Sequence, residues 1–172
     1  MTVRPLLLYP DAGLRRPAEP VAAFDASLAA LAADLLDTLR AVGAIGLTAP
    51  HIGVPRRLVV IRLQPDEPHA HYVNPEIVWA SPERALVDEG SVSMPGVIEP
   101  VERAARVRAR WHDLDGVPRD AEMEGFPAAC LQHEIDQLDG VFWIERLTRL
   151  RRERALRRYA KLRAGERRRT AP

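Results

Sequence analysis

Residues 131–140 read LQHEIDQLDG, and the core of this stretch, HEIDQ at 133–137, differs by one residue from a metal-hydrolase signature. An α-helix places positions i and i+4 on the same face, so a His-Glu-x-x-His run offers two imidazoles to one metal ion. The intervening glutamate then lies beside the metal and takes a proton from bound water. Here the second imidazole position holds Gln137, so the stretch predicts a helix but leaves its chemistry open.

Turn-forming residues bracket this stretch and set the expected length of the helix. Pro127 suits the first turn and Gly140 the position after the last one. Helical spacing then gives an apolar stripe of Leu131, Ile135 and Leu138, and a second face of Cys130, His133 and Gln137. A site on this helix is therefore expected on the second face, with Glu134 beside it.

Length and composition predict a single domain with a substantial core. The chain has 172 residues, of which 47% are apolar and 28% charged. No apolar run approaches the roughly 18 residues that span a bilayer, and the first residues lack the pattern of a cleaved signal peptide. The one cysteine, Cys130, cannot form an intrachain disulfide and fits a reducing compartment. These features predict a soluble, cytoplasmic protein with no membrane partner.

The net charge of +1 conceals an uneven distribution. Twelve basic residues stand against two acidic ones between Arg146 and Pro172, so the rest of the chain carries an excess of nine negative charges. We therefore divide the chain into a domain at 1–148 and a basic C-terminal helix or tail at 149–172. Such a tail either attracts the phosphate backbone of RNA or is a solvated arginine-rich terminus.

Apolar periodicity and turn residues predict the remaining elements. Leucine at every third or fourth position predicts a helix over 25–42 that ends at Gly43, and Asp115-Gly116 predicts a tight hairpin turn. Residues 43–55 contain several glycines and prolines and are expected to be irregular. Extended segments are expected at 6–11, 57–63, 72–79, 85–87, 103–114 and 117–123, and an amphipathic helix at 147–162 with Leu150 and Tyr159 on its apolar side.

Three stretches together resemble the peptide deformylase family, whose enzymes remove the N-formyl group from new bacterial polypeptides. Ala44 to His51, AIGLTAPH, is similar to that family's G-x-G-L-A-A-x-Q loop, and Glu89 to Gly96, EGSVSMPG, is similar to its E-G-C-L-S segment. Gln132 to Gly140, QHEIDQLDG, is similar to its Q-H-E-x-D-H-L-x-G helix. The order and spacing of the three also match, so the resemblance covers about residues 4–148.

The resemblance implies an α+β fold in which antiparallel strands surround a central helix that carries metal ligands. In working members one cysteine and two histidines hold Fe²⁺, often replaced by Zn²⁺ or Ni²⁺. The ion lowers the pKa of its bound water, a glutamate moves the proton, and a glutamine amide stabilises the oxyanion.

Three of those five positions differ in this chain. The cysteine position holds Ser91, the second histidine position holds Gln137, and the oxyanion glutamine position holds His51. Only the ligand His133 and the general base Glu134 keep their family identities. A serine hydroxyl is a far weaker ligand than a thiolate, and an amide oxygen suits harder ions. We therefore expect weak or no deformylase activity.

Other arrangements stay open from the sequence. His51 and His133, with Gln137, would rebuild a site for a divalent ion such as Fe, Zn or Ni and leave an active hydrolase with Glu134 as its base. His133 is otherwise a hydrogen-bonded histidine without metal, and Cys130 is either a packed thiol or an additional ligand. A third hypothesis is a binding module that performs no chemistry.

The resemblance also implies a peptide groove. Gly46 and Leu47 match positions whose backbone pairs with an extended peptide by strand addition. The implied methionine pocket consists of Ile45, Val87, Phe126, Ala129 and Cys130. Arg103 and Asp136 match positions that pair and steady the helix. The implied partners are a formyl-methionyl peptide or nascent chain, and ribosomal RNA through the basic tail.

Overall fold

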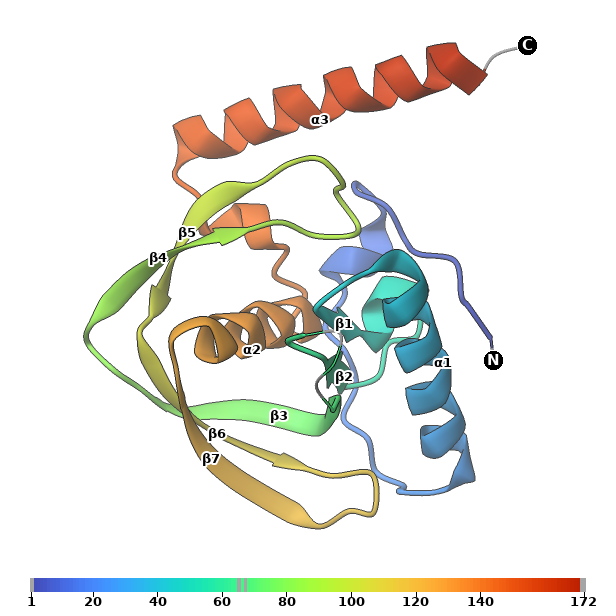
Figure 1. Cartoon of the computed structure of the whole chain (residues 1–172), viewed down its shortest axis with the longest axis vertical. Coiled ribbons are helices and arrows are strands. Elements are labelled where there is room, and N and C mark those ends of the chain that lie inside the picture. Colours follow the sequence, from blue (N-terminus) through green and yellow to red (C-terminus); the bar gives the residue numbers. More distant parts are fainter. Residues whose placement is uncertain (1, 65, 67, 171–172) are drawn as a thin grey trace.

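The protein is described by a computed structural model that covers residues 2–64, 66 and 68–170, with side chains as far as residue 165 (Figure 1). Its helices are α1 (Ala26–Val42), α2 (Gly125–Leu138) and α3 (Arg149–Thr170), with short 3-10 helices η1 (Ala12–Arg15), η2 (Ala49–Ile52) and η3 (Trp143–Arg146). Its strands are β1 (Gly46–Thr48), β2 (Leu58–Ile61), β3 (Ala70–Ala80), β4 (Arg84–Glu89), β5 (Glu99–Ala104), β6 (Arg106–His112) and β7 (Pro118–Glu124).

The strands form two antiparallel sheets on opposite sides of α2 (Figure 1). The larger sheet has the order β1-β2-β3-β6-β7, and β4 pairs with β5 alone. The pairing of β3 with β6 shifts register between Val73 and Glu76 and again between Ile77 and Trp79. Such irregularities bend a strand, which suits a sheet that wraps a helix.

α2 is the central element of the fold. It contacts each of the seven strands in the described chain, and its Leu131 and Leu138 are fully buried. Gln132 fixes the helix to β5, because its amide donates to the Ala104 carbonyl and accepts the Ala104 N–H, both at 3.0 Å. The expectation of an α+β fold with antiparallel strands around the motif-bearing helix is confirmed.

α1 begins and ends where its sequence provides caps. The Asp25 carboxylate accepts the N–H groups of Ser27 and Leu28 at 2.9 and 3.2 Å, which satisfies donors that a first turn leaves free. Gly43 ends the helix in the left-handed conformation, with a φ of 67°.

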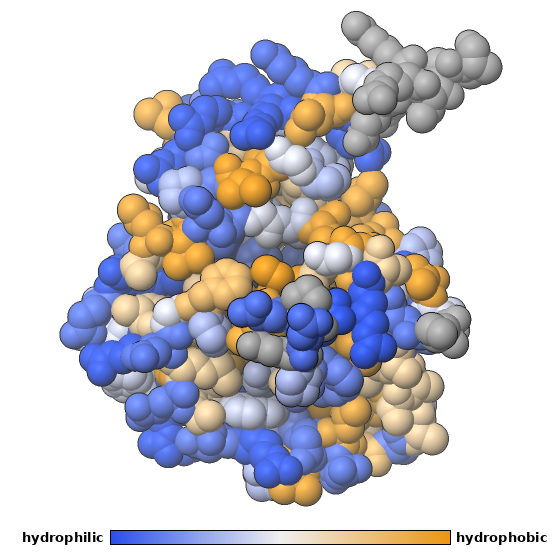
Figure 2. Space-filling model, in the orientation of Figure 1, coloured by the Kyte–Doolittle hydropathy of each residue, from blue (hydrophilic) through white to orange (hydrophobic). Residues whose placement is uncertain are grey.

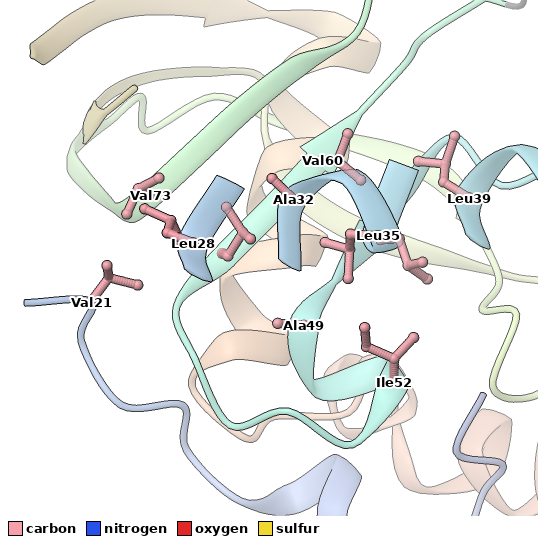
Figure 3. Packing of buried hydrophobic residues seen from close by; sticks show 11 residues of the cluster. Val21, Leu28, Ala32, Leu35, Leu39, Ala49, Ile52, Val60 and Val73 are labelled. Atoms are coloured by element: carbon pink, nitrogen blue, oxygen red, sulfur yellow. The ribbon is translucent and has the colours of Figure 1, made fainter. Parts of the chain in front are cut away.

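The leucine stripe of α1 packs on β1, β2 and η2 to form one hydrophobic cluster (Figure 3). Leu28, Leu35 and Leu39 are fully buried, as their spacing predicts. The labelled residues of this cluster are Val21, Leu28, Ala32, Leu35, Leu39, Ala49, Ile52, Val60 and Val73. β1 and η2 both pack on this cluster, and both elements also carry residues of the candidate site.

Two sequence-based assignments are wrong. Alternation predicts one strand over 103–114, but the chain passes from one sheet to the other at Ala105, whose N–H donates to the Glu83 carbonyl at 2.9 Å. The alternation of apolar and polar residues continues across this point, so it does not reveal that β5 and β6 belong to different sheets. Residues 46–48, expected to be irregular, form β1, because the neighbouring β2 supplies a partner that local sequence does not reveal.

The N-terminal segment (residues 7–14) forms no strand but holds two parts of the chain in place. The Leu7 N–H donates to the His51 carbonyl at 2.8 Å. The Tyr9 N–H donates to the Ser93 carbonyl, also at 2.8 Å. The segment therefore joins η2 to the loop that follows β4.

α3 lies across the β4–β5 end of the molecule (Figure 1). Tyr159 is buried as expected, whereas Leu150, expected on the same apolar side, is 77% exposed. Arg154 donates to the Glu99 carboxylate at 2.7 Å and links the helix to β5. Hydrophilic residues dominate this end of the surface in Figure 2. The last part of the predicted basic tail, residues 171–172 and the side chains of 166–170, lies outside the described residues.

None of the helices in the described part of the chain combines the length and apolar character that a membrane span requires.

We expect Leu35→Ala to lower the free energy of unfolding by about 2–5 kcal/mol, because it leaves a cavity in a fully buried position. Urea denaturation followed by circular dichroism measures the change. Leu150→Ala is the matched control, since that side chain is 77% exposed and its truncation should change stability by less than about 0.5 kcal/mol. Equal effects of the two substitutions would contradict the assigned core.

Candidate functional site

A cavity of about 400 Å³ opens between α2, the segment that leads into β1, and the strand β4 with its following loop. Its wall includes most of the residues that the sequence singles out: Ile45, Gly46, His51, Val87, Ser91, Phe126, Ala129, Cys130, His133 and Glu134. Residues from 43 to 134 thus meet in one place. The cavity is the candidate site.

Two predicted site residues do not line this cavity. Leu47 is fully buried in the cluster beneath α1, because alternate residues of a strand point to opposite faces and Gly46 faces the cavity. Gln137 is 2% exposed, and its amide Nε2 donates to the Leu14 carbonyl at 2.7 Å. The expectation that residues 133 and 137 present their side chains to one point is therefore wrong for Gln137.

His133 is held by a buried carboxylate. Its Nδ1 lies 2.8 Å from the Glu89 carboxylate, which also accepts two hydrogen bonds from Arg103 at 2.6 and 2.9 Å. Burial alone would raise the pKa of Glu89, but the hydrogen bonds from Arg103 and His133 outweigh it and lower the pKa to about 2. An ionised carboxylate only accepts, so Nδ1 of His133 carries a proton.

Arg103 connects this pair to a second carboxylate on α2. Its guanidinium donates to Asp136 at 2.5 Å, as the paired positions in the sequence predict. Asp136 also accepts two hydrogen bonds from Arg146 of η3. Arg103 is 4% exposed, and its single buried positive charge contacts the carboxylates of both Glu89 and Asp136.

Glu134 lies directly against the backbone of Gly46. A β-carbon added at Gly46 would stand 2.2 Å from Oε1 of Glu134, so a larger residue there would displace the Glu134 carboxylate. Glu134 is 5% exposed, and its Oε2 has no hydrogen-bond partner among the described residues. Burial, partly opposed by His133 and reinforced by Glu89, raises the pKa of Glu134 to about 7.

His51 is fixed by a capping box at the start of η2. The Thr48 N–H donates to Nδ1 of His51 at 3.1 Å, and the Thr48 side chain accepts the His51 N–H in return. A ring nitrogen that accepts a backbone N–H carries no proton, so the proton of the neutral ring lies on Nε2. Burial, and to a smaller extent the charge of His133, lower the pKa of His51 to about 3.

Ser91 is engaged within its own turn. Its Oγ accepts the Ser93 N–H at 3.1 Å, and its carbonyl accepts the Met94 N–H at 2.9 Å. The hydroxyl lines the cavity, and it remains a neutral donor and acceptor.

Residues 3–153 of the chain match the model of the polypeptide deformylase family. A peptide deformylase-like protein from Bradyrhizobium diazoefficiens is 58% identical over 165 residues, which is 96% of this chain and 97% of that protein. The chain belongs to the polypeptide deformylase family. A peptide deformylase from Novosphingobium aromaticivorans is 40% identical over 185 residues, with coverage of 95% and 98%.

Solved deformylase structures have the same fold. The peptide deformylase from Legionella pneumophila superposes with a TM-score of 0.91 at 37% identity, covering 99% of this chain and all of that one. The enzyme from Synechococcus elongatus, in complex with actinonin, gives a TM-score of 0.87 at 33% identity, covering 91% and 88%. The residues that match the family model therefore include the whole of α2 and all the residues that line the cavity.

The metal ion that the deformylase resemblance implies does not fit the residues of this chain. No three His, Cys, Asp or Glu side chains in the described ranges are arranged to hold an ion. Burial, with the negative charges of Glu134 and Glu89, raises the pKa of Cys130 to about 12, so its thiol stays protonated and is a poor ligand. His51 directs a proton-bearing nitrogen to the cavity, and Gln137 is turned away from it.

Sequence reasoning missed two features of the site. Glu89 belongs to the quoted EGSVSMPG stretch, but its hydrogen bond to His133 becomes visible only when β4 and α2 meet. Ile98 lines the cavity and is 60% exposed, and no pattern in the loop after β4 identifies it.

We expect Glu134→Gln to stabilise the protein more at pH 8 than at pH 5. The folded-state pKa of Glu134 is raised from 4.5 to about 7, so the folded state retains a proton that the unfolded chain has lost. Stability therefore falls as pH rises through this window, by about 3 kcal/mol, and glutamine removes that loss. Urea unfolding of both proteins between pH 5 and 8 measures the pH dependence of their stabilities. A stability difference between the two proteins that does not change with pH would contradict the raised pKa of Glu134.

Proposed function

We propose that this deformylase-family protein has weak or no deformylase activity. The proposal is supported by the side chains at the two replaced ligand positions, which both form hydrogen bonds with the backbone. The Ser91 hydroxyl accepts the Ser93 N–H, and the Gln137 amide donates to the Leu14 carbonyl. A metal site contributes roughly 10 kcal/mol or more only when its ligands are deprotonated and converge. His133 alone does not provide such a site.

The alternative of an active hydrolase with a rebuilt metal site finds less support. It requires His51 to offer a lone pair to the ion, but Nδ1 of His51 already accepts the Thr48 N–H and Nε2 carries the proton. Glu134 has the raised pKa that a general base needs. Without metal-bound water, Glu134 has no activated nucleophile to deprotonate.

A specific observation favours binding without turnover. The cavity and its apolar wall are present, with Ile45, Val87, Phe126 and Ala129 where the family resemblance implies a methionine pocket. β1 pairs with β2 on one side only, so its other edge is open to an extended peptide. We infer that formyl-methionyl peptides, or nascent chains that begin with formyl-methionine, are the ligands of this groove.

Restoring the family residues tests the proposal. We expect the purified wild-type protein to contain little transition metal and to release little formate from formyl-Met-Ala-Ser. The variant that combines Ser91→Cys, Gln137→His and His51→Gln should bind Ni²⁺ or Fe²⁺ near one per chain and hydrolyse the peptide at least about tenfold faster. Plasma mass spectrometry and a formate assay give the two readouts.

Two results would contradict the proposal. One is a wild-type protein with nearly one transition metal per chain whose formate release disappears in Glu134→Gln. The other is a triple variant that binds metal but shows no gain over the wild type, since the replaced residues would then not limit turnover. Glu134→Gln in the triple variant is the control, because the restored activity needs its base.

We also propose that α3 binds RNA of the ribosome through its phosphate backbone. Arg157, Arg158 and Lys161 are exposed and have no acidic partner among the described side chains. Replacing all three with alanine should weaken binding and reduce the slope of log K against log salt by about 2. A control with the same loss of charge replaces Arg108, Arg110 and Arg119 on β6 and β7. Filter binding to ribosomal RNA measures both variants, and equal losses would contradict a role for α3.

A further inference from the structure

α3 and the cavity both contact one short segment of the chain, residues 95–98, which we call the wall segment. All of its residues line the cavity, and it leads directly into Glu99, the first residue of β5. α3 crosses this end of the molecule (Figure 1). The contacts between α3 and the wall segment therefore decide how firmly one side of the cavity is held.

Apolar side chains of α3 pack on the wall segment. Ala155 and Tyr159 are buried in one cluster with Val97, which is 1% exposed. Further along the helix, Leu162 lies so close to Gly96 that a β-carbon added to the glycine would stand 2.9 Å from Cδ1 of the leucine. These contacts carry no charge, so an anion that binds to α3 does not act on them directly.

An ion pair also joins α3 to the end of the wall segment, and this contact is open to anions. Nη2 and Nε of Arg154 donate to the two carboxylate oxygens of Glu99 at 2.7 and 3.2 Å. The Glu99 side chain is 7% exposed, whereas the Arg154 side chain is 64% exposed. A buried negative charge is thus paired with a cation that dissolved ions can reach.

The ion pair is also part of a basic groove on α3, which is lined by Arg154, Arg157, Arg158, Lys161 and Leu162. Arg154 and Leu162 therefore belong both to the surface proposed to bind RNA and to the contact with the wall segment. A phosphate in this groove competes for the donors of Arg154 and brings negative charge towards the Glu99 carboxylate. Both effects weaken the ion pair.

Weakening the ion pair affects the cavity through Glu99. A buried carboxylate without its cation is unfavourable, because its charge is both desolvated and unpaired. Glu99 regains hydration by moving towards water, and the adjoining wall segment moves with it. A ligand in the cavity needs the wall segment in place, since all of its residues line the cavity. RNA on α3 and a ligand in the cavity therefore favour different positions of the same segment.

We propose that the Arg154–Glu99 ion pair couples the two sites, so that RNA bound to α3 loosens the wall segment and weakens ligand binding in the cavity. By linkage, a ligand in the cavity weakens RNA binding by the same factor. The inference rests on the proposed function, which supplies the two ligands. It adds a regulation, in that the protein holds a peptide more tightly in the absence of RNA than in its presence.

Hydrogen exchange of the full-length protein, measured by mass spectrometry with poly(U) as the RNA, tests the coupling. We expect saturating poly(U) to speed exchange at residues 94–99 by about fivefold or more. Arg154→Ala should have a similar effect without RNA, because it also leaves the Glu99 charge unpaired. In Glu99→Gln the effect of poly(U) should fall below about twofold, since no buried charge remains to lose its partner.

Arg108→Ala is the matched control for Arg154→Ala. Arg108 forms an ion pair of the same length, 2.7 Å, with Asp120 on the neighbouring strand β7, and neither residue lines the cavity. Its replacement should leave exchange at residues 94–99 unchanged. Circular dichroism checks that each variant is folded.

Calorimetric titration with formyl-Met-Ala-Ser measures the effect on the cavity. We expect saturating poly(U) to weaken binding of this peptide to the wild-type protein about fivefold or more, and to Glu99→Gln by less than about twofold. The comparison is made within each protein, with and without poly(U), so a change in the basal affinity of the variant does not affect it.

Three outcomes would overturn the inference. These are bound poly(U) that leaves exchange at residues 94–99 unchanged, an equal response to poly(U) in the wild type and Glu99→Gln, or equal effects of Arg154→Ala and Arg108→Ala on these residues. A lack of poly(U) binding at low salt would contradict both the coupling and the proposed role of α3. Formate release by the wild-type protein would contradict only the proposed weak activity, because hydrogen exchange is measured without peptide. The failures are therefore distinguishable.

Discussion

The buried guanidinium of Arg103 is the interaction on which the rest of the site depends. It lies on β5 and joins Glu89 at the end of β4 to Asp136 on α2, so one side chain fixes the smaller sheet to the central helix. Removing one charge from such a group leaves the others buried and unpaired. The resulting loss of folding free energy is much larger than the net stabilisation that the intact group provides. Glu89 also forms a hydrogen bond with Nδ1 of His133, so the same network fixes the orientation of the His133 ring. One network of buried charges thus fixes both the central helix and a histidine that lines the cavity.

The three replaced positions share one structural property. Each side chain satisfies a backbone group nearby: His51 with Thr48, Ser91 with Ser93, and Gln137 with the Leu14 carbonyl. Hydrogen bonds of this kind stabilise the local turns and satisfy buried polar groups. The three side chains are therefore fixed by the protein's own backbone.

Sequence predicts this fold well where local pattern and tertiary packing agree. The leucine stripe of α1 and the motif of α2 identify two helices, because helical spacing determines which side chains share a face. Most of the cavity wall is implied by the family resemblance and not by spacing. The pattern fails for Gln137, whose backbone position is as expected but whose long side chain rotates toward a carbonyl 123 residues away. It also fails at Ala105, where the chain changes sheets, and at residues 46–48, which form a strand only through their pairing with β2.

The N-terminal segment has a consequence for how the molecule forms. Residues 7–14 contact η2, the loop after β4, and, through the Leu14 carbonyl, the end of α2. The last of these contacts closes a loop of more than one hundred residues, and long-range contacts of this kind form late because closing them costs chain entropy. A chain still growing on the ribosome cannot complete the cavity until residue 137 has emerged. Of the contacts made by residues 7–14, the one at the Leu14 carbonyl is therefore the last whose partner is synthesised, after His51 and Ser93.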